Sequence, residues 1–423
     1  MTILIKNAKI VDPANKLEIN GDILIVNGLI EKVGAGIHFQ ADSVINANGL
    51  TAIPGLVDMH VHLRDPGQEY KEDIITGCDA AVSGGVTCLA AMPNTTPTAD
   101  NTQIVEYIIN KAKSAKARVY PVAAITIGLK GEELTDFVEL KKSGVIAFTD
   151  DGRPVESARV MRNALFLAKK VGSHILSHSE ELTLAGGIMN EGTVSQKMRV
   201  KATPNAAEDV AIAREVALSA TTECPIHICH VSSKNALKLI RAAKKDGVLV
   251  TCETAPHYFT FTDEQMYKKD ADFRMNPPLR SEEDRQELLK SIVDGTIDAI
   301  ATDHAPHSRE DKADFLKAPN GVVGMQTSLS ASYTELVKSQ LISMDRLVEL
   351  MCLNPAKILG LPYGTLSVGA PADVVLFDEN AEWVVEADKL EGKSHNTPFK
   401  NRKLCGKVVA TVCRGEIVFD RLI

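Results

Sequence analysis

From Gly55 to about residue 308 the sequence repeats one pattern, in which an apolar run of strand length is followed by apolar residues at helical spacing. Buried strands that alternate with helices pair in parallel, and eight of them can close a (β/α)8 TIM-like barrel. An open doubly wound sheet is the alternative, but no Gly-x-Gly-x-x-Gly motif follows the first strand. The pattern predicts an α/β fold with strands at 56–63, 85–92, 118–126, 144–150, 174–179, 225–232, 248–254 and 298–303.

Several stretches between these runs carry helix signals. Residues 157–170 have apolar side chains at helical spacing and begin with Ser157, a residue type that caps helices. Residues 205–219 and 281–293 behave in the same way. We therefore expect helices in these three stretches.

The two ends of the chain show short alternating segments instead, which are typical of half-buried strands. Asn27-Gly28 between two of them is a hairpin turn signal. Similar segments return at 372–377 and 407–412. We predict a small β-sandwich domain built from residues 1–52 and 363–423, beside a barrel formed by residues 53–362.

The composition excludes several classes of protein. Hydrophobic residues make up 44% of the 423 residues, which argues for a large core and against disorder. The net charge of -8, without a basic block, argues against a nucleic-acid partner. No apolar run reaches the roughly 20 residues that cross a membrane, and the N-terminus lacks a signal-peptide pattern. The eight cysteines form no Cys-x-x-Cys pair, so we expect reduced thiols in a cytoplasmic protein.

Histidines and aspartates recur where the expected strands end. His60 and His62 stand two residues apart, so their imidazoles leave the same face of an extended chain. His178, His230 and Asp303 follow at the ends of later strands. Because functional side chains gather at the C-terminal ends of barrel strands, we expect these residues to meet. Such nitrogen and carboxylate ligands suit zinc, as one ion or as two ions bridged by a carboxylate.

Other histidines compete for these roles. His174 shares a strand face with His178, but four residues span about 13 Å, so one metal cannot bind both. His227 and His230 face opposite ways, and the later residue lies closer to the strand end. We favour His178 and His230. His257 is as compatible with packing as with function.

Catalysis requires more than ligands. Zinc lowers the pKa of bound water, and a carboxylate that touches both metal and water can accept the released proton. Asp303 is the candidate for this role. Asp150 and Asp151 face opposite ways, so one is expected to point into the site and the other to cap a turn. The residues alone do not decide between them.

Three polar side chains are candidates for substrate contacts. Arg64 offers a planar fork for a carboxylate, although an ion pair with Asp65 or Glu69 is an equal alternative. Asn94 and Asn276 offer amide donors and acceptors for a polar ring.

These motifs together resemble the amidohydrolase superfamily and, within it, the dihydroorotases of the bacterial class I type. The resemblance covers nearly the whole chain, and its motifs around His60 and Asp303 are highly specific in combination. The segments that carry it are 53–67 (IPGLVDMHVHLRDPG), 91–97, 148–152 (FTDDG), 228–233, 275–279, 301–307 (ATDHAPH), 354–357 and 369–376.

The resemblance implies reversible ring closure of N-carbamoyl-L-aspartate to (S)-dihydroorotate in pyrimidine synthesis. It implies Asp151 as the bridging ligand and Asp303 as both ligand and acid/base. The remaining implied ligands are His60 and His62, with Asp303, for one zinc and His178 and His230 for the other. The implied substrate-binding residues are His62, Arg64, Asn94, Asn276, His307 and Gly321.

The sequence departs from the family pattern in places. Asn320 stands where a Phe is common before Gly321, and 324–327 reads Gly-Met-Gln-Thr instead of Gly-Leu-Glu-Thr. Residues 397–402 lack a Gly often found there. The first two departures concern backbone contacts to substrate near Gly321, and the third concerns the β-domain.

The sequence also distinguishes this function from related ones. Hydantoinases and dihydropyrimidinases bridge their metals with a carboxylated Lys on the fourth strand, but residues 144–151 contain no Lys, and Lys141 and Lys142 lie before that strand. Allantoinase is disfavoured for the same reason. An inactive scaffold for aspartate transcarbamoylase should have lost metal ligands, and this chain keeps them. A homodimer, an association with that enzyme, and closure of loop 308–324 over substrate are compatible with the sequence but not decided by it.

Overall fold

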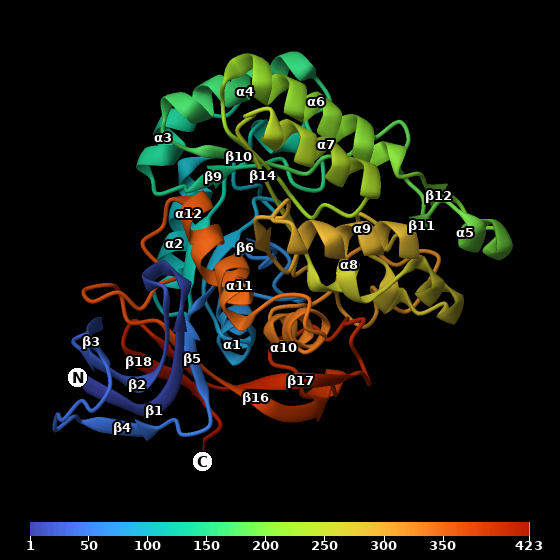
Figure 1. Ribbon diagram of the computed structural model, residues 1–423. Coiled ribbons are helices and arrows are strands. Elements are labelled where there is room, and N and C mark those ends of the chain that lie inside the picture. Colours follow the sequence, from blue (N-terminus) through green and yellow to red (C-terminus); the bar gives the residue numbers. More distant parts are fainter. Residues whose placement is uncertain (423) are drawn as a thin grey trace.

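The computed structural model describes residues 1–422. A group of parallel strands surrounded by helices forms the larger part, and a β-rich sheet made from both ends of the chain forms the smaller part (Figure 1). The fold is therefore α/β with a β-rich terminal unit.

Eight short parallel strands form the centre of the larger part. They belong to two sheets, one in the order β6-β7-β8 and the other in the order β15-β14-β13-β10-β9. Single bridges pair Ala123 with Phe148 and Val61 with His304, between the two sheets. In residues 1–422, the strand pairing alone does not show that the two sheets close into a single barrel. The strands are β6 (Leu56–Val61), β7 (Val86–Ala91), β8 (Arg118–Pro121), β9 (Ala147–Phe148), β10 (His174–Ser177), β13 (Ile226–Ile228), β14 (Val250–Thr254) and β15 (Ala299–Ile300).

Helices cover these strands from outside (Figure 1). The hydroxyls of Ser157 and Ser281 accept hydrogen bonds from backbone N–H groups and cap α4 and α9, so the predicted helix starts are confirmed. The helices are α1 (Ile74–Ser83), α2 (Thr102–Ala112), α3 (Phe137–Lys142), α4 (Ala158–Lys170), α5 (Thr193–Met198), α6 (Ala206–Thr222), α7 (Lys234–Lys245), α8 (Pro256–Thr260), α9 (Glu282–Val293), α10 (Ser328–Ser332), α11 (Met344–Val348) and α12 (Asn354–Leu359). The short strands β11 (Met189–Asn190) and β12 (Ala202–Thr203) flank α5.

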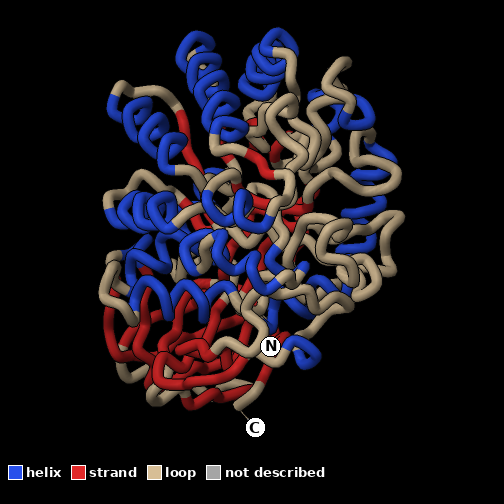
Figure 2. The backbone as a smooth tube through the Cα atoms, turned by 90° about the vertical axis from the view of Figure 1, so that its right-hand side faces the viewer, coloured by secondary structure: helices blue, strands red, loops and turns tan. Residues whose placement is uncertain are grey.

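The terminal strands form one eight-stranded sheet in the order β18-β17-β16-β5-β1-β2-β3, with β4 paired to β1. Figure 2 shows these strands gathered at one end of the molecule, near both termini. Asn27 and Gly28 have positive φ angles of 50° and 82° and form the predicted turn between β2 and β3. The strands are β1 (Thr2–Asp12), β2 (Leu17–Val26), β3 (Leu29–Gly34), β4 (Ser43–Asn46), β5 (Thr51–Pro54), β16 (Val374–Val384), β17 (Lys403–Cys413) and β18 (Glu416–Asp420).

The buried apolar residues form separate clusters. One cluster joins side chains of several parallel strands, including Val57, Cys88, Ala147, Leu176 and Ala299. The largest cluster lies between the strands and the helices, and another lies within the terminal sheet. The parallel strands are thus packed on more than one side, as their near-continuous apolar sequences require.

The structure differs from the sequence prediction mainly in element lengths. All eight parallel strands are shorter than predicted, and β9 and β14 begin later than predicted, with β9 also ending earlier. The expected division at residues 52 and 53 falls inside β5. None of the helices in residues 1–422 has the length and apolar character that a bilayer crossing requires.

Candidate metal centre

His60 and His62 leave the end of β6 and meet two carboxylates. Nε2 of His60 lies 3.2 Å from Oδ1 of Asp151 and 3.6 Å from Oδ1 of Asp303. Nε2 of His62 lies 3.3 Å from Oδ2 of Asp151 and 3.2 Å from Oδ1 of Asp303. All four side chains are buried. Asp151 therefore offers a different oxygen to each imidazole.

His178 and His230 also lie close to Asp151. Nδ1 of His178 is 2.9 Å from Nε2 of His230 and 3.4 Å from Oδ1 of Asp151. Nε2 of His230 is 3.8 Å from the same oxygen. The structure thus brings together the six residues expected as ligands, which are His60, His62, Asp151, His178, His230 and Asp303. His174 stands at the opposite end of β10 from His178.

The donor atoms of this group fit a divalent cation. Nε2 of His60 and Oδ1 of Asp151 are buried without a hydrogen-bond partner, and such atoms are costly unless something compensates them. Ligand atoms of His60, His62 and Asp303 lie within 4.8 Å of one another, as do those of His60, Asp151 and His230. Imidazole nitrogens and carboxylate oxygens are common ligands of zinc and related metals.

Asp150 and Asp151 have separate surroundings. The Asp150 carboxylate accepts hydrogen bonds from the backbone N–H groups of Ile125 and Thr126 and from the Thr126 hydroxyl. It therefore holds the loop after β8, and only Asp151 reaches the histidines. This arrangement separates the two aspartates that the sequence left undecided.

Three residues of the site have left-handed backbone conformations. The φ angles are 62° at Arg64, 37° at His230 and 47° at Asp303. For a residue other than glycine, such a conformation costs about 1–3 kcal/mol and persists only where the surrounding structure enforces it. Each of the three lies just beyond the end of a parallel strand, where the backbone turns sharply.

Arg64 is directed toward the loop after β15. Its Nε donates to the carbonyl of Pro306 at 3.1 Å, and one terminal nitrogen lies 3.3 Å from Nε2 of His307. Asp65 instead pairs with Lys111 at 2.6 Å. The alternative that Arg64 forms an ion pair with Asp65 or Glu69 is therefore wrong for this structure.

The other expected substrate-binding residues surround the same group. Oδ1 of Asn94 lies 2.8 Å from Nδ1 of His62, and Nδ2 of Asn276 lies 3.5 Å from Nε2 of His178. Gly321 has a φ of 139°, and a Cβ there would lie 2.8 Å from the Ala305 carbonyl oxygen. A side chain at position 321 would therefore clash with Ala305, so only glycine fits there.

Comparisons with known proteins agree with this arrangement. A family model described as dihydro-orotase-like matches residues 49–236, and an amidohydrolase family model matches residues 292–419. A protein named dihydroorotase from Geotalea daltonii is 51% identical over 425 residues, with 100% of both chains covered. Another of that name, from Acetivibrio thermocellus, is 48% identical and covers 98% of each chain. This chain belongs to the dihydroorotase family.

Solved structures place the family beside the hydantoinases. L-hydantoinase (dihydropyrimidinase) from Arthrobacter aurescens superimposes with a TM-score of 0.90 at 27% identity, covering 99% of this chain and 96% of its own. A D-hydantoinase gives a TM-score of 0.87 at 26% identity. In this dihydroorotase-family chain, β9 holds no lysine, and Lys141 and Lys142 end the preceding helix α3.

Two carboxylates beside the histidines were missed by the sequence reasoning. Oε1 of Glu253, on β14, lies 2.9 Å from Nδ1 of His60. Oε2 of Glu180 lies 3.5 Å from Nε2 of His178 and accepts from Nδ2 of Asn276 at 3.2 Å. A signal was present for both in this dihydroorotase-family chain, because Glu253 stands one residue before the end of β14 and Glu180 three residues after the end of β10.

Burial and neighbouring charges shift the titration of these groups. Burial alone would lower the pKa of His178, but Asp151 and Glu180 raise it to about 10. Burial alone would raise the pKa of Glu253, but His227 and His60 lower it to about 2. Asp151 and Glu180 therefore favour a proton on the His178 imidazole, and a cation that binds there must displace it.

His307 has the opposite character. Burial and the neighbouring Arg64 lower the pKa of His307 to about 2, so its ring is neutral. Its Nε2 can donate to the Asn320 carbonyl at 2.8 Å or accept from Arg64, depending on the tautomer. Its Nδ1 is buried without a hydrogen-bond partner. The ring therefore has an unused polar atom beside Arg64.

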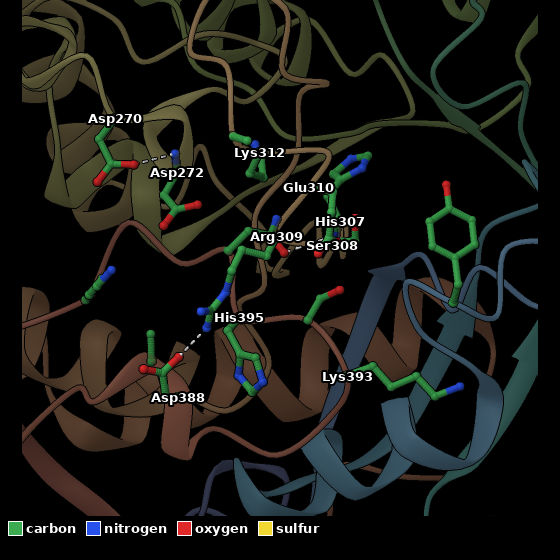
Figure 3. A pocket seen from close by; sticks show the side chains of 16 residues that line it. Asp270, Asp272, His307, Ser308, Arg309, Glu310, Lys312, Asp388, Lys393 and His395 are labelled. Atoms are coloured by element: carbon green, nitrogen blue, oxygen red, sulfur yellow. Dashed lines mark hydrogen bonds and ion pairs between the residues drawn. The ribbon is translucent and has the colours of Figure 1, made fainter.

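A cavity of about 580 Å³ opens on the side of His307. Figure 3 shows His307, Ser308, Arg309 and Lys312 grouped together, with Asp388, Lys393 and His395 from a later segment. Nζ of Lys312 donates to the carbonyls of Ala271, Arg274 and Pro319. These bonds tie the loop at residues 308–324 to the segment that precedes Asn276.

Proposed function

We propose that this protein is a zinc-dependent cyclic amide hydrolase that interconverts N-carbamoyl-L-aspartate and (S)-dihydroorotate in pyrimidine biosynthesis. The observation that carries the proposal is the joint placement of Arg64 and His307 beside two carboxylates and four histidines. This arrangement provides both a cation site and a neighbouring site for an anionic substrate. Membership of the dihydroorotase family supports the same reaction.

The ligands in this proposal are His60, His62, Asp151, His178, His230 and Asp303, and their mixture of nitrogen and oxygen donors favours zinc, with one or two ions bound. When bound, zinc polarises a carbonyl group and lowers the pKa of water.

Asp303 is the proposed acid/base. Its Oδ1 lies 3.2 Å from Nε2 of His62 and 3.6 Å from Nε2 of His60, so it faces the region where the ring amide must react. The His60, His62 and His230 imidazoles hold the pKa of Asp303 below its ordinary range despite burial. Asp303 is therefore an ionised carboxylate that can take a proton from water and deliver it to the leaving ring nitrogen.

Arg64 and His307 are proposed to hold the substrate carboxylate. The Arg64 guanidinium is buried and has no carboxylate partner among its hydrogen bonds in residues 1–422. A bidentate contact with a substrate carboxylate would compensate its charge. Asn94, Asn276, His62 and the backbone at Gly321 are proposed to contact the rest of the substrate.

The proposal is tested by comparing dihydroorotate with neutral dihydrouracil and hydantoin. Dihydroorotate should be hydrolysed with a kcat/KM at least about 100-fold higher, because only this substrate carries the carboxylate. Arg64→Ala should abolish most of that preference, whereas Arg162→Ala, on the exposed face of α4, should not change it. Equal turnover of the three compounds by the native protein would instead favour a hydantoinase-like function.

We also propose that the eight parallel strands close into a (β/α)8 barrel, with residues 1–52 and 363–423 as a separate small domain. The bridges at Ala123–Phe148 and Val61–His304 support closure. Hydrogen exchange tests this: the amides of Thr149 and His62, which donate to Ala123 and His304, should be as protected as those inside the sheets. Fast exchange at both would contradict it. Homodimerisation, association with aspartate transcarbamoylase and a cytoplasmic location stay predictions.

A further inference from the structure

Glu253 is a buried carboxylate placed between two imidazoles. It extends from β14, and its Oε1 lies 2.9 Å from Nδ1 of His60 on β6. Its Oε2 lies 3.3 Å from Nε2 of His227 on β13, without hydrogen-bond geometry. Nδ1 of His227 is in turn 2.9 Å from the Thr251 hydroxyl. The shorter of the two contacts of Glu253 is therefore the one to His60.

This contact determines which nitrogen of His60 is available. An ionised carboxylate only accepts hydrogen bonds, so Nδ1 of His60 must carry the proton that it donates to Glu253. In a neutral imidazole the other nitrogen, Nε2, then has a free lone pair. Nε2 is the atom that faces Asp151 and Asp303 and has no hydrogen-bond partner.

A similar contact orients His62, but with an uncharged partner. Oδ1 of Asn94 accepts at 2.8 Å from Nδ1 of His62 and leaves Nε2 directed at the carboxylates. Asn94 is also placed to contact substrate, whereas Glu253 is 1% exposed and lies behind His60. Glu253 can therefore act on the site only through the imidazole.

We propose that Glu253 is a positioning residue of the metal centre: it fixes the tautomer and orientation of His60 and strengthens His60 as a ligand through its negative charge. The proposal rests on the proposed metal dependence. Carboxylates behind a ligand histidine raise its basicity, and their removal typically weakens metal binding about 10–100-fold.

The test measures zinc affinity of purified, metal-free full-length protein by competition with a chromophoric chelator. Glu253→Gln keeps an acceptor oxygen and removes the charge, and Glu253→Met removes the acceptor as well. We expect zinc affinity to fall in the order native, Gln, Met, with a loss of about 10–100-fold for Met. Glu215→Gln is the matched control, because Glu215 is fully buried but pairs with Arg214 on α6.

A double-mutant cycle separates this role from general stability. If Glu253 acts through His60, adding Glu253→Met to His60→Ala should lower zinc affinity no further than His60→Ala alone. Native zinc affinity in a folded Glu253→Met variant would overturn the proposal. Additive losses in the cycle would overturn it as well.

Histidine nitrogen NMR on the native protein gives a test that needs no variant. Metal-free native protein should show a proton on Nδ1 of His60, and a ring protonated on Nε2 alone would refute the inference. These readouts are independent of turnover. A native protein that binds zinc tightly but does not hydrolyse dihydroorotate would refute the proposed function and leave the role of Glu253 standing.

Discussion

Asp150 and Asp151 are neighbours in the chain, but their carboxylates serve different parts of the molecule. Oδ1 of Asp151 lies 3.2 Å from Nε2 of His60, whereas Oδ1 of Asp150 accepts the backbone N–H of Ile125 at 2.8 Å. Both residues follow the end of β9, and their side chains diverge there, one toward the histidines and the other toward the loop after β8. The two positions therefore allow a matched pair of substitutions.

Asp151→Asn should lower the bound metal measured by elemental analysis and reduce kcat at least about 100-fold, because an amide is a poor bridging ligand. Asp150→Asn should leave the metal content unchanged but lower the free energy of unfolding by about 1–3 kcal/mol, since it weakens hydrogen bonds to buried N–H groups. Urea unfolding and metal analysis of both variants check this. If Asp150→Asn lost the metal and Asp151→Asn kept it, Asp150 would be the metal ligand and Asp151 the structural residue.

Asp303→Asn should reduce kcat by about 100- to 10,000-fold, because an amide cannot carry the proton. Calorimetric binding of dihydroorotate should persist, since the Arg64 region is not changed. Asp298→Asn is the control, because Asp298 stands just before β15, as Asp303 stands after it, and pairs with Lys244. Near-native turnover by Asp303→Asn would exclude Asp303 as the proton carrier.

Gly321→Ala should lower kcat/KM for dihydroorotate by about 10-fold, equivalent to about 1.4 kcal/mol. The added Cβ would lie 3.0 Å from Cδ2 of His307 and would displace the ring or the Gly321 backbone. Gly36→Ala provides the comparison, since Gly36 also has a positive φ but no atom within 4 Å of the added Cβ. If steady-state kinetics find the two variants equally active, Gly321 does not define the substrate site.

Glu72 should make stability depend on pH. The side chain is fully buried and accepts from the N–H of Lys393, and burial raises the pKa of Glu72 from its ordinary 4.5 to about 7. Between these values the folded state holds more protons than the unfolded state, so this contribution to stability falls as pH rises. The loss from pH 4.5 to above pH 7 is up to roughly 3 kcal/mol.

A glutamine at position 72 does not titrate. As pH rises from 5 to 8, the free energy of unfolding of Glu72→Gln should therefore increase relative to that of the native protein. Urea unfolding of both proteins at each pH measures the difference, in which the other titrating groups cancel. A difference that stays constant over this range would mean that Glu72 titrates normally.

Simple geometric rules predicted much of the site. The two-residue spacing of His60 and His62 and the positions of His178, His230 and Asp303 at strand ends follow from patterns within short stretches. The same rule applies to Glu253, one residue before the end of β14. Its partner His60 is on another strand, and only the pairing of distant strands reveals that contact.

Other features depend on contacts between distant parts of the chain, which local sequence patterns do not predict. Whether Arg64 pairs with Asp65 or lies beside His307 depends on the backbone turn at Arg64, where φ is 62°. Strand lengths were overestimated because an apolar run does not show where ladder pairing stops. The segment 189–203, with its two short strands and α5, was also not anticipated, since its strands have two residues each.

The position of β5 has a consequence for the order of events during synthesis. β5 pairs on one side with β1 and on the other with β16, and only Gly55 separates it from β6, which carries His60. Most of the chain must therefore leave the ribosome before the second edge of β5 is covered. We expect the nascent protein to hold His60 and His62 next to an open strand edge, so that cation loading follows release of the full-length chain.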